Sequence, residues 1–228
     1  MEIKSFIKDY LARLKLILDD IDPDVVSNIV CALEETVVNK SRIFIIGNGG
    51  SSATASHMVN DLGVGLRRRN IINFDVASLD DNGSVVSAIA NDIGYENIFF
   101  MQMKGLLRPN DVIIAISCSG DSPNITKAVD YAKELGCVII GLTGFEGGYL
   151  RKVSDVSFHV NASKDDYGLV EDVHMILDHI IYSYYTKKWS FILITEELIK
   201  WNNDCDPLTF ATSGSTVILT LPEVTSMS

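Results

Sequence analysis

Histidine and carboxylate side chains recur at helical spacing in two separate segments of the sequence. His57 and Asp61 are four residues apart, so a helix would bring both side chains to one face. A later helical segment can place four further candidates on one flank: Glu171, His174, Asp178 and His179. Mixed nitrogen and oxygen ligands at such spacing suit a divalent metal, with zinc as the first choice. By contrast, His159 stands inside a predicted strand and is typical of a structural residue.

Two loops rich in glycine and serine follow apolar runs and precede helical patterns. The first, at 47–52, reads Gly-Asn-Gly-Gly-Ser-Ser, and the second, at 117–123, reads Ser-Cys-Ser-Gly-Asp-Ser-Pro. Glycines let the backbone turn sharply, while free amides and the dipole at a helix start favour an anion. Either loop alone fits a structural turn with a serine N-cap equally well. Two such loops at neighbouring strand ends predict one polar cradle for a monophosphate.

The elements that must position these residues alternate between strand and helix. Apolar runs predict five strands, at about 42–47, 74–79, 111–117, 137–144 and 155–160. Helical patterns cover 2–19, 23–39, 51–66, 123–135 and 168–188. Continuous apolar strands separated by helices indicate an α/β fold, a doubly wound, flavodoxin-like, five-stranded parallel sheet with N-terminal helices. In the strand order 2-1-3-4-5, the two serine-rich loops flank the switch point at which such sheets bind ligands.

Length, charge and cysteine usage exclude several classes of function. The 228-residue chain is long enough for one full α/β domain, and its net charge of −11 repels nucleic acid and anionic lipid surfaces. The basic run at 67–69 is typical of a solvated loop. The four cysteines form no Cys-x-x-Cys pair, which favours a reducing compartment. With neither a secretory signal pattern nor a membrane-length apolar run, the sequence predicts a cytoplasmic protein without nucleic-acid or membrane partners.

We expect one domain over residues 1–188, including the N-terminal helices. The segment 189–228 changes character, because a short helical pattern is followed by a stretch rich in Pro, Gly, Ser and Thr. We treat 189–228 as a C-terminal appendage of unknown role.

Four segments in the same order resemble the phosphoheptose isomerase branch of the SIS (sugar isomerase) family: GNGGSSATASH, AIANDIGYENIF, ISCSGDSPNI and GLTGFEGGYL. The resemblance spans about residues 1–187. It implies homotetramers with active sites at subunit interfaces, which interconvert sedoheptulose 7-phosphate and glycero-manno-heptose 7-phosphate. It also implies the substrate-binding residues, which are Asn48, Gly49, Gly50, Ser51, Asp92, Ser117, Cys118, Ser119, Ser122 and Glu171.

The same resemblance implies a zinc site formed by His57, Asp61, Glu171 and His179. Two departures from the family pattern stand at these positions: Asp61 is one methylene shorter than the usual Glu, and Glu171 replaces a neutral Gln. We predict Asp61 as the catalytic base and His179 as its acid–base partner in an aldose–ketose isomerisation through an enediol. The alternative is a non-catalytic SIS-domain protein that binds a replication initiator. A phosphosugar-sensing regulator is less favoured, because no DNA-binding segment accompanies this acidic chain.

Overall fold

The protein divides into two compact units, Met1–Thr186 and Lys187–Ser228. The computed structural model describes residues 2–203, with 189–203 as backbone only. The last helix, α8 (Tyr167–Asn203), was predicted to end near Lys188 but continues as a helix to Asn203. The predicted domain boundary at 188 stays a prediction, and residues 204–228 of the predicted appendage lie outside the described residues.

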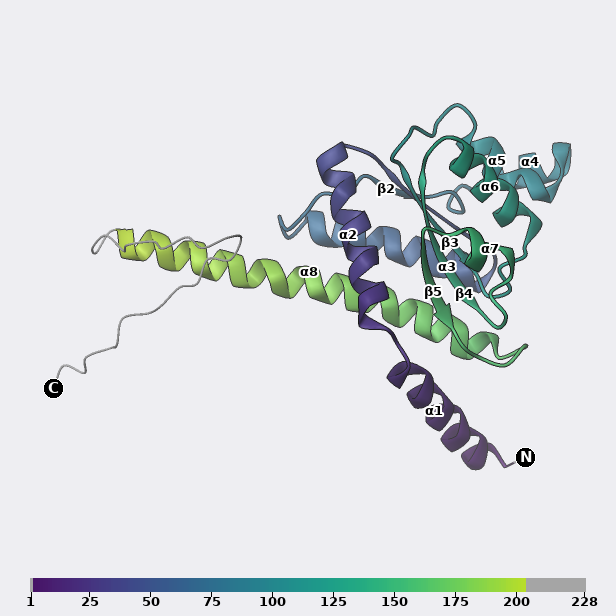
Figure 1. Ribbon diagram of the computed structural model, residues 1–228, viewed down its shortest axis with the longest axis horizontal. Coiled ribbons are helices and arrows are strands. Elements are labelled where there is room, and N and C mark those ends of the chain that lie inside the picture. Colours follow the sequence, from purple (N-terminus) through teal and green to yellow (C-terminus); the bar gives the residue numbers. More distant parts are fainter. Residues whose placement is uncertain (1, 204–228) are drawn as a thin grey trace. The chain divides into compact units, whose positions relative to one another are not determined.

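The first unit is built on a five-stranded parallel sheet (Figure 1). Its strands are β1 (Ile43–Gly47), β2 (Val76–Ser78), β3 (Val112–Ser117), β4 (Val138–Gly144) and β5 (Val156–Val160). The order β2-β1-β3-β4-β5 confirms the predicted doubly wound topology. The order reverses at β1, so the loops after β1 and β3 lie side by side at the carboxyl edge.

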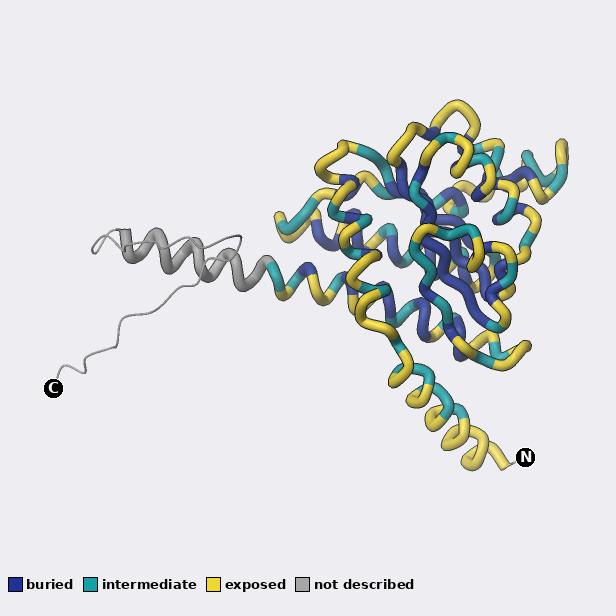
Figure 2. The backbone as a smooth tube through the Cα atoms, in the orientation of Figure 1, coloured by how far each residue is buried: buried dark blue, intermediate teal, exposed yellow. Residues whose placement is uncertain are grey.

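Helices cover both faces of this sheet. The α-helices of the described chain are α1 (Ile3–Asp19), which buries none of its residues, α2 (Pro23–Asn39), α3 (Gly50–Met58), α4 (Gly83–Ile93), α5 (Ile98–Met103), α6 (Pro123–Glu134), α7 (Gly148–Val153) and α8. On one face, α5, α6 and α7 bury apolar side chains against Phe44, Ile113 and Ile139. Because successive strand residues point to opposite faces, Ile45 and Ile114 turn to the other face. All five of these strand side chains are buried, and Figure 2 shows the sheet as the buried centre of the unit.

The segment predicted as one helix over 51–66 consists of two kinds of helix. The α-helix α3 ends at Met58, and a π-helix, η1, runs from Val59 to Gly65. Two glycines let neighbouring elements approach this wider turn closely. A Cβ on Gly63 would lie 3.0 Å from a Val76 methyl group of β2, and one on Gly65 would lie 3.0 Å from the Tyr182 ring of α8. The π-helix therefore fits its backbone between β2 and α8.

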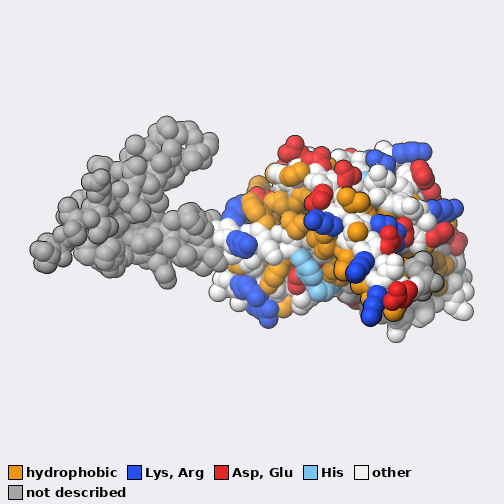
Figure 3. Space-filling model, turned by 90° about the horizontal axis from the view of Figure 1, so that it is seen from below, with side chains coloured by type: hydrophobic (Ala, Val, Ile, Leu, Met, Phe, Trp, Pro, Cys, Tyr) orange, Lys and Arg blue, Asp and Glu red, His pale blue; other side chains and the backbone are white. Residues whose placement is uncertain are grey.

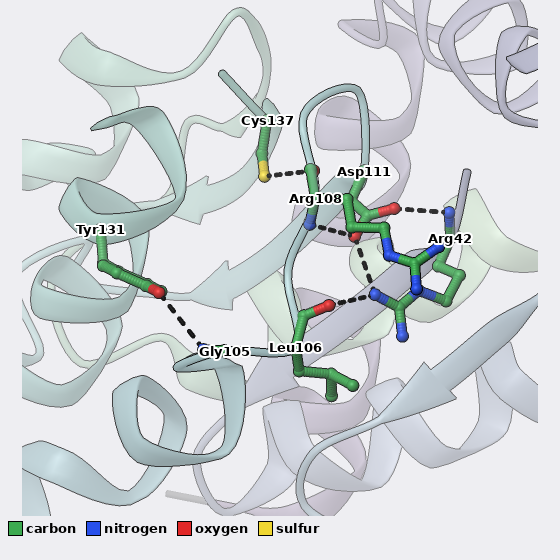
Figure 4. Close-up of polar contacts among 7 residues, drawn as sticks. All are labelled: Arg42, Gly105, Leu106, Arg108, Asp111, Tyr131 and Cys137. Atoms are coloured by element: carbon green, nitrogen blue, oxygen red, sulfur yellow. Dashed lines mark hydrogen bonds and ion pairs between the residues drawn. The ribbon is translucent and has the colours of Figure 1, made fainter. Parts of the chain in front are cut away.

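A charged network joins β1 and β3 at their amino ends, opposite the serine-rich loops (Figure 4). The Asp111 side chain is 1% exposed and accepts hydrogen bonds from the backbone N–H groups of Arg42 and Arg108, each at 2.9 Å. The Arg42 guanidinium lies 3.3 Å from the same carboxylate and also donates to the Leu106 carbonyl. The hydrogen bonds and the ion pair of this one carboxylate tie the two central strands together at their amino ends.

Candidate functional site

A cavity of about 150 Å³ lies where the two serine-rich loops meet the start of α8. Seven of its nine lining residues were predicted to bind substrate: Asn48, Ser51, Ser117, Cys118, Ser119, Ser122 and Glu171. Ile116 and Tyr167 complete the lining. The hydroxyls come from β3, α3 and the loop that starts α6, so the two loops do form one polar pocket. Three hydroxyl-bearing elements around a small cavity suit a phosphate group.

Side-chain hydrogen bonds join the first loop to α6 and to the turn before α5. The amides of Asn48 and Asn124 bond to each other in both directions, at 2.8 and 3.0 Å. The Tyr95 hydroxyl donates to the same Asn48 oxygen at 2.8 Å. Within the second loop, the Ser117 hydroxyl accepts the Gly120 N–H at 3.1 Å. These bonds hold both loops in a fixed shape before any ligand is bound.

Three predicted substrate-binding residues do not line the cavity. Gly49 and Gly50 belong to the first loop itself, where Gly49 has a φ of +56° and Gly50 begins α3. Asp92 is exposed on α4 and accepts a hydrogen bond from the Asn91 amide at 2.9 Å.

A second polar site lies further along α3 and α8. His57, Asp61, Asp178 and His179 each offer one ligand atom, and these four atoms lie within 4.8 Å of one another. The two histidine Nε2 atoms are 3.2 Å apart, and His57 Nε2 lies 3.6 Å from the Asp61 carboxylate. His57 is half-exposed and His179 exposed, and Figure 3 shows histidine side chains at the surface among hydrophobic ones. We call this group the His/Asp cluster.

The His/Asp cluster has the donor set of a divalent-metal site. Zinc holds imidazole nitrogens at about 2.0–2.1 Å, so two nitrogens on one tetrahedral ion are about 3.3 Å apart. The observed 3.2 Å between the two Nε2 atoms matches that spacing. Burial, and then the nearby Asp61 charge, raise the pKa of Asp178 to about 7. These residues fit a divalent metal.

Three of the four predicted metal ligands come together in the His/Asp cluster, and the fourth, Glu171, lies elsewhere. Glu171 lines the cavity, and its carboxylate lies against Gly50, where an added Cβ would be 2.3 Å from Oε2. Burial, followed by this negative charge, raises the pKa of the neighbouring Cys118 thiol to about 11. Glu171 thus belongs to the cavity between the serine-rich loops and not to the His/Asp cluster.

Some residues at the site were not singled out from the sequence. Asp80 follows β2 at the same sheet edge and accepts the Gly47 N–H at 3.1 Å. Burial, only partly offset by this hydrogen bond, raises the pKa of Asp80 to about 7. Its position directly after a strand was the available signal. Tyr95 and Asn124 carry no such local signal, because their roles depend on contacts with Asn48.

The remaining histidines are structural. His174 is fully buried on α8, its Nε2 lies 3.3 Å from the Thr143 carbonyl, and burial lowers its pKa to about 4. His159 bonds to the Thr143 hydroxyl at 3.0 Å and lines a separate cavity of about 460 Å³ beside the α1–α2 junction. That larger cavity contains none of the predicted site residues.

Comparison with known proteins gives a consistent family. The SIS domain model matches residues 7–144, more than half of the chain. A phosphoheptose isomerase from Geotalea daltonii is 37% identical over 180 residues, covering 79% of this chain and 92% of that protein. One from Helicobacter pylori is 36% identical over 177 residues, covering 76% and 90%. The solved phosphoheptose isomerase from Neisseria gonorrhoeae superposes with a TM-score of 0.71 at 25% identity, over 81% and 97% of the two chains.

The chain belongs to the SIS-domain family. Within that family it falls in the phosphoheptose isomerase branch, and it is a sugar-phosphate isomerase. These relatives do not favour the alternative of a non-catalytic interaction protein. Within the described part of the chain, no helix combines the length and the apolar character that a membrane crossing requires.

Proposed function

We propose that the protein interconverts sedoheptulose 7-phosphate and D-glycero-D-manno-heptose 7-phosphate through an enediol. The observation that carries this proposal is the arrangement of two distinct polar sites along the same pair of helices. The hydroxyl-lined cavity lies at the start of α3 and α8, and the His/Asp cluster lies further along both. Glu171 and His179 are eight residues apart on α8, which corresponds to about 12 Å along a helix axis. An extended heptose phosphate is of this order of length.

The cavity would hold the phosphate at one end of this substrate. Ser51, Ser117, Ser119 and Ser122 offer hydroxyl groups, and the starts of α3 and α6 offer free amides and positive dipole ends. None of the nine lining residues is a lysine or an arginine. Recognition therefore depends on hydrogen bonds of fixed direction, which position the sugar more strictly than a point charge would.

Proton transfer between the adjacent sugar carbons is assigned to the His/Asp cluster. Asp61, with 12% of its side chain exposed, is the base that takes a proton from one carbon and returns it to the next. His179 is exposed beside it and moves the proton on the sugar oxygen. The Asn60 amide donates to the second Asp61 oxygen at 2.9 Å and thereby fixes the orientation of the carboxylate.

His57, Asp61 and His179 would hold a divalent ion, with zinc as the preferred metal. When bound, such an ion polarises the substrate carbonyl and stabilises the negative charge that develops on its oxygen.

We also propose that the protein assembles as a homotetramer with active sites at subunit interfaces. Helix α1 buries none of its residues within one chain. Its exposed apolar side chains include Ile3, Ile7 and Leu11, which are 66%, 48% and 57% exposed. Apolar side chains at three- and four-residue spacing form the kind of stripe that packs against another helix. Light scattering of the purified protein should give about four times the mass of one chain, and a monomer would overturn the assembly proposal.

The direct test is incubation of the purified, zinc-supplemented protein with sedoheptulose 7-phosphate, followed by NMR of the products. We expect the aldose signals of the heptose phosphate to appear. Asp61→Asn keeps the size of the side chain but removes its basicity, so it should lower kcat by at least about 100-fold with a nearly unchanged KM. Full activity of Asp61→Asn would eliminate Asp61 as the base. Absence of turnover in the parent protein would refute the proposed reaction.

A further inference from the structure

Asp178 is a buried carboxylate without a hydrogen-bond partner in the described part of the chain. Its side chain is 0% exposed, and neither carboxylate oxygen accepts a hydrogen bond. It lies on the core-facing stripe of α8, where Leu177 and Ile181 on either side of it are also buried. A buried carboxylate is normally paired with a cation or accepts several hydrogen bonds. Within the described residues, the groups near Asp178 that can carry a positive charge are the imidazoles of His57 and His179, and no hydrogen bond stabilises the Asp178 carboxylate, so a cation in the cluster would stabilise it.

The groups that face Asp178 are those of a metal site. Its Oδ2 lies 3.8 Å from His57 Nε2, which is too long for a hydrogen bond. Asp61 is the other carboxylate in the cluster, and its charge acts on Asp178. Two carboxylates close together repel each other unless a cation lies between them. Ligand atoms of both carboxylates and both imidazoles fall within 4.8 Å, which leaves room for one ion among them.

We propose that Asp178, and not Glu171, is the fourth protein ligand of a divalent-metal site formed with His57, Asp61 and His179. This inference rests on the proposed function, because it concerns the metal ion of the proposed active site. It corrects the ligand set expected from the sequence, in which Glu171 held the fourth place. Two imidazoles and two carboxylates balance the charge of a divalent ion and supply the donor types that zinc accepts.

The position of Glu171 supports the assignment of Asp178 as the metal ligand in its place. Seven residues separate Glu171 from Asp178 on α8, a distance of about 10 Å along the helix axis. The Glu171 carboxylate lies against Gly50 and lines the cavity between the serine-rich loops. Glu171 is therefore placed beside the phosphate position, where its carboxylate can accept hydrogen bonds from the neighbouring sugar hydroxyls.

Burial also separates the roles of the two aspartates. With no exposed surface, Asp178 has no path to a substrate atom and acts only on an ion inside the cluster. Asp61 retains an exposed edge and can reach both the ion and the substrate. Asp178 is thus a ligand and not a catalytic base.

The test compares Zn²⁺ affinity in three variants of the full-length protein. Each protein is stripped with a chelator and titrated with Zn²⁺ against a competing colorimetric chelator. Asp178→Asn should weaken Zn²⁺ binding by at least about 100-fold, because loss of supporting groups alone weakens metal sites by 10–100-fold. Glu171→Gln should bind Zn²⁺ within about threefold of the parent. Asp172→Asn is the matched control, since Asp172 is an exposed carboxylate on the same helix that already accepts a hydrogen bond from Tyr10.

A second readout does not depend on the folding of the Asp178 variant. In the parent protein, Co²⁺ replaces Zn²⁺ as a spectroscopic probe, and a four-coordinate site with two imidazoles and two carboxylates gives intense visible absorption. Zn²⁺ should also raise the melting temperature of the parent and of Glu171→Gln alike. If Glu171→Gln loses Zn²⁺ affinity and Asp178→Asn keeps it, the assignment is wrong. If the parent binds neither Zn²⁺ nor Co²⁺, the site itself is refuted.

These outcomes are distinct from failure of the proposed reaction. Turnover of sedoheptulose 7-phosphate by a parent protein that binds neither Zn²⁺ nor Co²⁺ would leave the isomerase proposal standing while overturning the metal site. Zn²⁺ binding that depends on Asp178 in a protein without turnover would support this inference and refute the proposed reaction.

Discussion

The backbone at Gly120 offers a sharp test of how the second serine-rich loop is built. Gly120 has a φ of +71°, and its N–H donates to both the carbonyl and the hydroxyl of Ser117, each at 3.1 Å. Its carbonyl accepts the Leu150 N–H at 2.9 Å. A Cβ added at Gly120 would lie 1.9 Å from the Gly147 carbonyl oxygen, which is backbone and has no rotamer to change. Gly120→Ala must therefore displace one of the two loops.

The expected size of the effect comes from two contributions. The left-handed conformation costs alanine about 1–2 kcal/mol, and overpacking against fixed atoms adds about 1–3 kcal/mol. A total of about 3 kcal/mol corresponds to a melting temperature lower by roughly 6–12 °C for a domain of this size. Gly136→Ala is the matched control, because Gly136 ends the helix that Gly120 precedes, has a φ of +80°, and has nothing within 4 Å of an added Cβ. With only the left-handed cost of about 1.5 kcal/mol, it should lower the melting temperature by roughly 3–6 °C.

The same two variants, Gly120→Ala and Gly136→Ala, should also differ in KM for the substrate. Circular dichroism melting gives the stability difference, and KM for sedoheptulose 7-phosphate gives the state of the loop. Gly120→Ala should raise KM at least about tenfold, since loss of one hydrogen bond to a charged group has this effect. Gly136→Ala should leave KM unchanged. Equal melting temperatures and equal KM values for the two variants would refute the view that contact with Gly147 shapes the phosphate loop.

Three further outcomes are expected. Ser119→Ala should raise KM about tenfold with little change in kcat, because it removes one hydroxyl from the cavity lining, and an unchanged KM would remove Ser119 from the site. The raised pKa of Asp80 means that folding favours its protonated form, so stability is lost as the pH rises from about 4 through 7. Asp80→Asn should therefore flatten the fall in melting temperature between pH 5 and 8, and an unchanged slope would contradict the burial argument. A chain ended after Lys188 should keep its melting temperature and turnover, since the cavity and the His/Asp cluster precede that residue, whereas loss of folding would show that the rest of α8 is required for packing.

The fold was predictable because its signals are local. Each strand core is a short continuous apolar run, and such runs alternating with helical patterns specify a parallel sheet. The wider turn of η1 was not predictable in this way. It depends on Val76 and Tyr182 packing against Gly63 and Gly65, and these contacts join residues far apart in the sequence. The four-residue spacing still brought His57 Nε2 to within 3.6 Å of the Asp61 carboxylate, although Asp61 itself lies in the π-helix.

Two sequence signals made part of the candidate site predictable. Some of its residues directly follow a strand, and others are four residues apart on a helix. The serine-rich loops meet because strand order alone brings the ends of β1 and β3 together. The role of Asp80 was missed because an aspartate after a strand is also typical of an ordinary turn. Asn124 stands within a segment that was recognised, but its hydrogen bonds with Asn48 could only be seen in three dimensions.

Asp178 shows where spacing and burial lead to different conclusions. By spacing it is one of four histidine and carboxylate candidates on one flank of α8, and the ligand set implied by the family resemblance did not include it. In the structure it is buried between apolar neighbours with neither oxygen bonded. An unpaired buried carboxylate costs several kcal/mol, a large fraction of the stability of a small domain. A positive charge close to the carboxylate offsets that cost, and two sources fit the geometry: a protonated His57 at 3.8 Å, or a metal ion among the four ligand atoms of the His/Asp cluster.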